Sequence, residues 1–82
     1  MRMVCQRVLE AKVTVNNQTV GSIGRGLLIY LGVGKGDTVD DAQFMAYKIV
    51  NLRIFADQAG KMNLNVQDVA GAILLISNFT LH

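Results

Sequence analysis

The sequence predicts an α+β domain, and three observations support this fold class. The N-terminal part of the chain contains many β-branched residues, and one turn interrupts it. A stretch with helical periodicity occupies residues 39–52, and an apolar run with strand character closes the chain at residues 72–82. Strands that come first, then one helix and then a last strand are typical of α+β domains rather than of strictly alternating α/β folds.

Three strands are expected before the helix. Residues 4–15 carry many β-branched side chains and indicate one long strand. The pair Asn16-Asn17 tolerates positive φ, and it predicts a hairpin turn into a second strand at residues 19–23. A glycine-containing turn then leads into residues 27–33, an apolar run bounded by glycines, which predicts a buried central strand.

One amphipathic helix is expected at residues 39–52. Thr38 precedes it, and Asp41 occupies the third helical position, which is the pattern of a capped helix start. Asp40 places further negative charge near the positive end of the helix dipole. The apolar side chains that recur at helical spacing are Ala42, Met45, Ile49 and Leu52. After the helix the sequence is rich in turn residues, with one short strand expected near residues 62–64.

The last strand changes character along its length. Residues 73–76 are apolar on both faces, so this part is expected to lie in a sheet covered on both sides. Beyond Ser77, one face carries Asn78, Thr80 and His82 instead. Two interpretations stay open: the strand leaves the core, or it forms a pocket wall in which hydroxyl and amide groups orient a small polar substrate.

Composition limits the size and the surroundings of the protein. The chain has 82 residues, enough for one small domain. Counted with glycine and without tyrosine, roughly 59% of its residues are apolar, against about 45–50% in average domains. So small a chain buries only about 60–65% of its surface on folding. The chain is therefore expected either to be part of a larger fold or to bury a face against a partner subunit.

Several classes of protein are disfavoured. No apolar run approaches the roughly 20 residues of a membrane-spanning helix, and the first residues do not resemble a signal peptide. The net charge is +2, and the basic residues are scattered rather than gathered in a nucleic-acid-binding run. The single cysteine, Cys5, excludes an internal disulfide and suits a reducing compartment, and one Cys with one His gives no usual zinc-ligand cluster.

Three motifs suggest phosphate binding, acid–base catalysis or a Ser–His dyad, but their residues or spacing do not fit these functions. The stretches GSIGRG and GVGKGDT lack the spacing of a phosphate-binding P-loop, because Lys35 is followed by glycine rather than by Ser or Thr. Asp40 and Asp41 are adjacent and cannot share a helix face, so capping is the better interpretation. Ser77 and His82 would lie about 16 Å apart on one continuous strand, too far for a nucleophile and its base within that strand. The alternative that stays open is a partner chain that brings its own His82 near Ser77.

Four stretches together resemble the N-terminal half of the D-aminoacyl-tRNA deacylase family. They are CQRVLEAKVTV, GSIGRGLLIYLGVGKGDT, NLRIFADQAGKMNLNVQDVAG and LLISNFTL, and the similarity extends along nearly all 82 residues. The family's strand motif Ser-Gln-Phe-Thr-Leu is Ser77-Asn78-Phe79-Thr80-Leu81 here, with Asn78 one methylene shorter than the family's Gln. This resemblance implies the deacylase-like fold, a mostly antiparallel, barrel-like sheet with one amphipathic helix.

The resemblance also implies a function and a site. The implied reaction is hydrolysis of the ester that joins a D-amino acid, or glycine, to the terminal adenosine of tRNA, in cytoplasmic quality control of translation. The implied assembly is a homodimer with sites at the subunit interface, without a metal or another cofactor. Ser77, Asn78, Phe79 and Thr80 are the implied catalytic segment, in which Thr80 ranks first. The implied substrate-binding residues are Gln6 and Arg7. Arg7 matches an arginine of the family that helps to hold the family's second motif in place.

That second motif is a Gly–cis-Pro pair in the family's C-terminal half, where it rejects L-amino acids. This chain contains no proline. We therefore expect residues 1–82 to form one partial domain that lacks the C-terminal half of the family fold and is inactive by itself. The alternative is a non-catalytic module related to the family that dimerises through its apolar surface.

Overall fold

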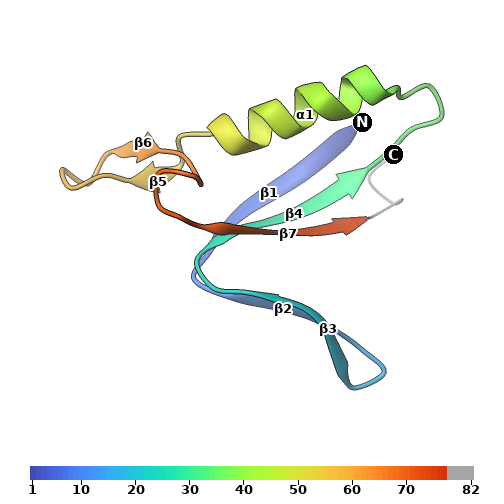
Figure 1. Ribbon diagram of the computed structural model, residues 1–82, viewed down its shortest axis with the longest axis horizontal. Helices are drawn as coiled ribbons and strands as arrows, with labels where there is room; N and C mark the ends of the chain where they lie inside the picture. Colours follow the sequence, from blue (N-terminus) through green and yellow to red (C-terminus); the bar gives the residue numbers. More distant parts are fainter. Residues whose placement is uncertain (78–82) are drawn as a thin grey trace.

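The computed structural model describes residues 1–77, which form one helix and seven strands (Figure 1). In chain order the elements are β1 (Arg2–Val8), β2 (Ala11–Val15), β3 (Gln18–Ile23), β4 (Gly26–Gly32), α1 (Val39–Asn51), β5 (Phe55–Ala56), β6 (Met62–Leu64) and β7 (Ala72–Ser77). Within this part of the chain, no helix is long and apolar enough to cross a membrane.

The main sheet has three strands in the order β1-β4-β7. The central strand β4 is antiparallel to β1 and parallel to β7, so that Ile29 lies between Cys5 on one side and Leu75 on the other. This arrangement confirms the predicted central strand, although it covers Gly26–Gly32 rather than residues 27–33, and Val33 beyond its end is 57% exposed. The other two ladders, β2-β3 and β5-β6, are antiparallel and separate from the main sheet. The structure is thus mostly sheet with one helix, but the described ladders form no closed barrel.

The core lies between α1 and one face of the main sheet (Figure 1). Leu27 and Ile29 of β4 contribute its centre, Ile49 comes from α1, and Phe55 and Val66 close one end. Three of these five side chains are fully buried, which is typical of a small domain with a single apolar centre.

The start of α1 follows from its capping residues. The Thr38 hydroxyl accepts a hydrogen bond from the backbone N–H of Asp41 at 3.2 Å. In return, a carboxylate oxygen of Asp41 accepts one from the backbone N–H of Thr38 at 2.9 Å. Two of the four backbone N–H groups that a helix start leaves without an intrahelical partner are therefore satisfied. The predicted helix is confirmed, with its last residue at Asn51 rather than Leu52.

The predicted hairpin is confirmed at β2 and β3, which project from the main sheet (Figure 1). Its turn residues Asn16 and Asn17 have φ values of 51° and 64°, the left-handed conformation that asparagine tolerates. The hairpin also contacts β7, because the Cα of Gly21 in β3 approaches Leu74 so closely that an added Cβ would lie 3.0 Å from its side chain.

The prediction of one long strand over residues 4–15 is wrong. The strand breaks at Leu9 and Glu10, and Leu9 is 85% exposed. The cause is a change of pairing partner: β1 pairs with β4, whereas β2 pairs with β3. Four strands therefore precede the helix instead of three. The two-residue strand β5, which pairs with the predicted short strand β6, was not expected either.

The expectation that residues 73–76 are covered on both faces is also wrong for the described part of the chain. Ile73 is 39% exposed and Leu75 is 55% exposed, although both side chains lie on the face of the sheet that α1 covers elsewhere. The reason is position, because β7 is an edge strand of the sheet and has no neighbour beyond it among the described strands. The opposite face of β7 is less exposed, since Leu74 and Ile76 are half-buried.

Candidate functional site

Ser77 is the last residue of β7 and the last residue that the structure describes. It pairs with Leu31 of β4 and is exposed on the face of the sheet that carries Leu75. The other three residues of the predicted catalytic segment, Asn78, Phe79 and Thr80, lie outside the described residues. Their roles stay predictions.

An apolar groove of about 500 Å³ runs along α1 next to this face. One wall is formed by helix residues that include Ala42, Met45 and Ile49. The opposite side is formed by Leu31 of β4 and Leu75 of β7. Ser77 is not one of the lining residues, but it shares a face of β7 with Leu75 and pairs with Leu31, and both of these line the groove.

Gln6 and Arg7 are neighbours on β1 and therefore lie on opposite faces of the main sheet. Gln6 is exposed and pairs with Leu28. Arg7 pairs with Leu27, and its guanidinium donates a hydrogen bond to the backbone carbonyl of Ile54, just before β5. The structure thus gives Arg7 a bracing role between β1 and the segment that follows α1, and it does not bring Gln6 to the same place.

Arg7 and Ser77 lie at opposite ends of the sheet. Arg7 aligns with Leu27 and Ser77 aligns with Leu31 on the same central strand. Four residues along β4 and two strand spacings across the sheet place the two Cα atoms about 16 Å apart. One small ligand group cannot contact both residues within a single chain.

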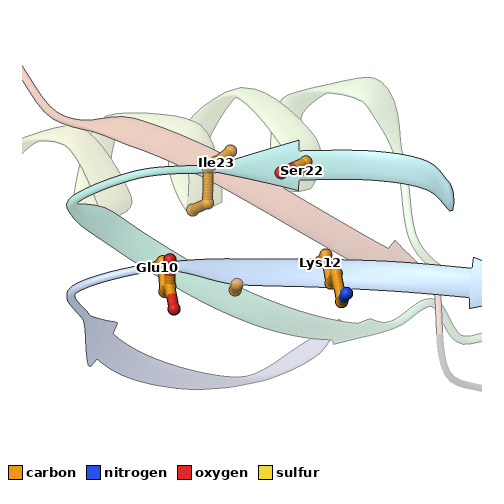
Figure 2. Close-up of a pocket in the computed structure, with 5 residues that line it drawn as sticks. Glu10, Lys12, Ser22 and Ile23 are labelled. Atoms are coloured by element: carbon orange, nitrogen blue, oxygen red, sulfur yellow. The ribbon is translucent and has the colours of Figure 1, made fainter.

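Two smaller hollows lie at the end of the sheet away from Ser77. The hollow in Figure 2, of about 300 Å³, is lined by the hairpin residues Glu10, Ala11, Lys12, Ser22 and Ile23. The other, of about 250 Å³, is lined by Arg7, Val8, Leu9, Arg25 and Ala56. The guanidinium of Arg25 also lies over the Phe55 ring, 5.4 Å from its centroid. Arg7 and Arg25 thus place two positively charged side chains around one hollow at this end of the sheet.

Cys5 is an unsuitable nucleophile in this environment. Its side chain lies on β1 toward the core and is half-buried. Burial raises the pKa of the Cys5 thiol above its usual value, which disfavours the reactive thiolate. Over residues 1–77, no three His, Cys, Asp or Glu side chains gather in a group that could hold a metal ion.

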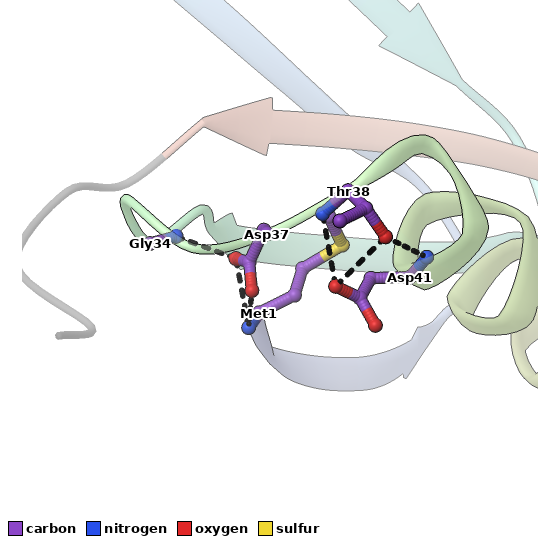
Figure 3. Close-up of polar contacts among 5 residues, drawn as sticks. All are labelled: Met1, Gly34, Asp37, Thr38 and Asp41. Atoms are coloured by element: carbon purple, nitrogen blue, oxygen red, sulfur yellow. Dashed lines mark hydrogen bonds and ion pairs between the residues drawn. The ribbon is translucent and has the colours of Figure 1, made fainter.

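The groove has a polar end that the sequence did not reveal. Met1, Asp37 and Thr38 contribute to its lining, and the Met1 amino group lies 2.8 Å from Asp37 (Figure 3). No side-chain pattern identifies a terminal amine as an interacting group, and Asp37 belongs to the glycine-rich stretch GVGKGDT. The two partners are 36 residues apart in the sequence, so only the fold brings them into contact.

The sequence matches, over residues 4–82, the profile of a protein family described as D-Tyr-tRNA(Tyr) deacylase. A curated relative named D-aminoacyl-tRNA deacylase, from Desulforamulus reducens, is 62% identical over 82 residues, which are 100% of this chain and 55% of the relative. A relative with the same name from Thermotoga petrophila is 56% identical over 82 residues, again 100% of this chain and 55% of the relative. The chain spans about half the length of the curated relatives it matches.

A solved structure has the same fold over this region. The protein, titled c-Myc DNA Unwinding Element Binding Protein, superimposes with a TM-score of 0.96 at 42% sequence identity. The superposition covers 100% of this chain and 56% of that protein. The arrangement of strands and helix seen here is therefore that of one half of a longer folded chain.

Proposed function

Because the chain belongs to the D-Tyr-tRNA(Tyr) deacylase family, we propose that it supplies the ester-positioning half of a D-aminoacyl-tRNA deacylase. The reaction is hydrolysis of the ester between a D-amino acid, or glycine, and the terminal adenosine of tRNA. It releases the free amino acid and the tRNA, as a quality-control step of translation in the cytoplasm. The observation that carries the proposal is that Ser77 is exposed and pairs with Leu31, which lines the apolar groove, within a chain 62% identical to a deacylase.

The proposed chemistry depends on positioning rather than on a protein nucleophile. Residues 77–80 hold the adenosine and the ester, the 2′-hydroxyl of the tRNA assists the reaction, and backbone dipoles stabilise the developing oxyanion. Thr80 is the residue that we place closest to the ester. The proposal needs no metal and no cofactor.

The substrate-side roles of Gln6 and Arg7 are part of the same proposal. The hydrogen bond from Arg7 to Ile54 fixes its guanidinium at the surface, beside Arg25. A guanidinium group held in this way suits a carbonyl or phosphate oxygen as a further partner. Since Arg7 and Ser77 lie at opposite ends of the sheet, we propose that they serve different parts of the site, which the rest of the domain and a second subunit complete as a homodimer.

A non-catalytic module that dimerises is the second candidate function. The observation in its favour is the open apolar groove with Leu75 55% exposed on the edge strand. An apolar surface of this kind invites a protein partner whether or not a substrate binds nearby. The two candidates differ in whether residues 77–80 act on an ester.

The test joins residues 1–82 to the remaining half of the D. reducens relative and measures release of labelled amino acid from D-tyrosyl-tRNA. The L-tyrosyl form is the control substrate. We expect the fusion protein to hydrolyse the D form and to spare the L form. A folded, dimeric fusion protein without hydrolysis of the D form would contradict the deacylase proposal and favour the non-catalytic module.

A further inference from the structure

Two arginines line the hollow of about 250 Å³ at the end of the main sheet away from Ser77. Arg7 belongs to β1, and Arg25 lies in the turn that leads into β4. The other lining residues are uncharged, namely Val8, Leu9 and Ala56. The hollow is therefore bordered by two cations, and none of its lining residues is acidic.

The fold holds both guanidinium groups in place. Arg7 donates a hydrogen bond to the backbone carbonyl of Ile54, in the segment between α1 and β5. Arg25 lies over the ring of Phe55, 5.4 Å from its centroid, and Phe55 is fully buried. Two consecutive residues thus anchor the two arginines. A side chain that is already held loses less conformational freedom when it binds a ligand.

Neither arginine is neutralised within residues 1–77. In this part of the chain no Asp or Glu carboxylate forms an ion pair with Arg7 or Arg25. A guanidinium group also carries more N–H donors than the one that Arg7 uses here. The nearby charged residues Glu10 and Lys12 line the separate hollow of the hairpin (Figure 2). The hollow beside Arg7 and Arg25 is therefore suited to an anion.

The position of the hollow indicates which anion. Guanidinium groups bind the oxygens of carboxylates and phosphates through paired hydrogen bonds. Arg7 lies about 16 Å from Ser77 by strand spacing, so a ligand that reaches both must be long. An RNA strand meets this requirement, because it carries a negatively charged phosphate at every nucleotide. A free amino acid or an inorganic phosphate ion does not.

We propose that Arg7 and Arg25 form a binding site for a backbone phosphate of the tRNA, at a nucleotide other than the terminal adenosine. This inference rests on the proposed function, because it concerns the same substrate. A phosphate contact fixes the position of the RNA and does not read its sequence. The site therefore serves every tRNA alike. Arg25 is the residue to test, because Arg7 also braces the segment that follows α1.

The first test measures binding of uncharged tRNA to the fusion protein over a series of salt concentrations. Arg25→Met removes the charge and keeps an apolar side chain over Phe55, and circular dichroism checks that the variant is folded. Binding at low salt should weaken about tenfold, as expected for a hydrogen bond to a charged group. The slope of log affinity against log salt should become less steep by about 0.7–0.9.

Lys12→Met is the matched control, because it removes one positive charge from an exposed residue at the same end of the sheet. It should bind tRNA like the wild type. Equal affinities and slopes for Arg25→Met and Lys12→Met would overturn the proposal, and so would a wild-type fusion protein that does not bind tRNA. A fusion protein that binds tRNA through Arg25 but does not hydrolyse the D form would contradict the proposed function instead.

The second test identifies the phosphate. Synthetic RNA hairpins with the acceptor-stem sequence of the tRNA each carry one methylphosphonate linkage, which is uncharged, along the 3′ strand. At one linkage the missing charge should weaken binding to the wild-type fusion protein. It should have a clearly smaller effect on binding to Arg25→Met, because the partner charge is already gone. Equal effects in the two proteins at every linkage would contradict the assignment to a phosphate.

Discussion

Replacing Thr80 by alanine is expected to lower the rate of deacylation on the order of 100-fold in the fusion of residues 1–82 with the remaining half of a relative. The reason is that Thr80 is proposed to position the ester, and a small misplacement of reacting atoms is very costly. The loss should appear in kcat more than in KM, because the contact matters most in the transition state. Single-turnover release of D-tyrosine from charged tRNA is the measurement.

Two further variants make this result specific. Thr14→Ala changes an exposed threonine on the hairpin strand β2 and should leave the rate unchanged. Thr80→Ser keeps a hydroxyl group and should retain much more activity than Thr80→Ala. If Thr80→Ala turned over D-tyrosyl-tRNA as fast as Thr14→Ala, Thr80 would not belong to the site.

The second large effect concerns the pairing of β4 with β7. Gly26 pairs with Ala72, and a Cβ atom at residue 26 would lie 1.9 Å from the Ala72 carbonyl oxygen and 2.8 Å from its backbone nitrogen. Both obstacles are backbone atoms, so a side-chain rotation cannot relieve the clash. Gly26→Ala is therefore expected to separate the start of β7 from β4 and to lower the free energy of unfolding by about 3 kcal/mol or more.

Urea unfolding followed by circular dichroism measures this effect. Gly24→Ala is the matched control, because a Cβ at residue 24 meets no atom within 4 Å. Its unfolding midpoint should stay close to that of the wild type. A Gly26→Ala chain with the same midpoint as Gly24→Ala would show that the close approach of β4 and β7 is not needed for stability.

The parts of the fold that could be predicted from the sequence are those that local chemistry determines. The reciprocal hydrogen bonds of Thr38 and Asp41 start α1, and the two asparagines with positive φ turn the hairpin. The break between β1 and β2 was missed because it depends on a change of partner from β4 to β3. Such a change concerns segments far apart in the chain and leaves no periodic signal at Leu9 and Glu10.

The candidate site was predictable to a smaller extent. The resemblance predicts that Ser77 belongs to the catalytic segment, and this role stays a prediction. The structure shows Ser77 exposed and paired with Leu31, which lines the groove. The groove itself could not be predicted, because it depends on how far α1 reaches over the edge strand and leaves Leu75 exposed. The contact of Met1 with Asp37 could not be predicted from the sequence either, since a terminal amine has no sequence signature.

Arg7 and Ser77 lie far apart in the main sheet. The two lie about 16 Å apart by strand spacing, so the described residues do not form a complete site around one ligand. The chain also spans only 55% of its D. reducens relative. We therefore expect that hydrolysis with selection between D and L forms requires protein that residues 1–82 do not contain.

The most direct measurement is release of labelled D-tyrosine from D-tyrosyl-tRNA by purified 82-residue protein, beside the fusion protein at equal concentration. L-tyrosyl-tRNA is the control substrate for both. We expect release at the background rate by the 82-residue protein and rapid, D-selective release by the fusion protein. Robust hydrolysis of the D form by the 82-residue protein, with the L form spared, would contradict this expectation.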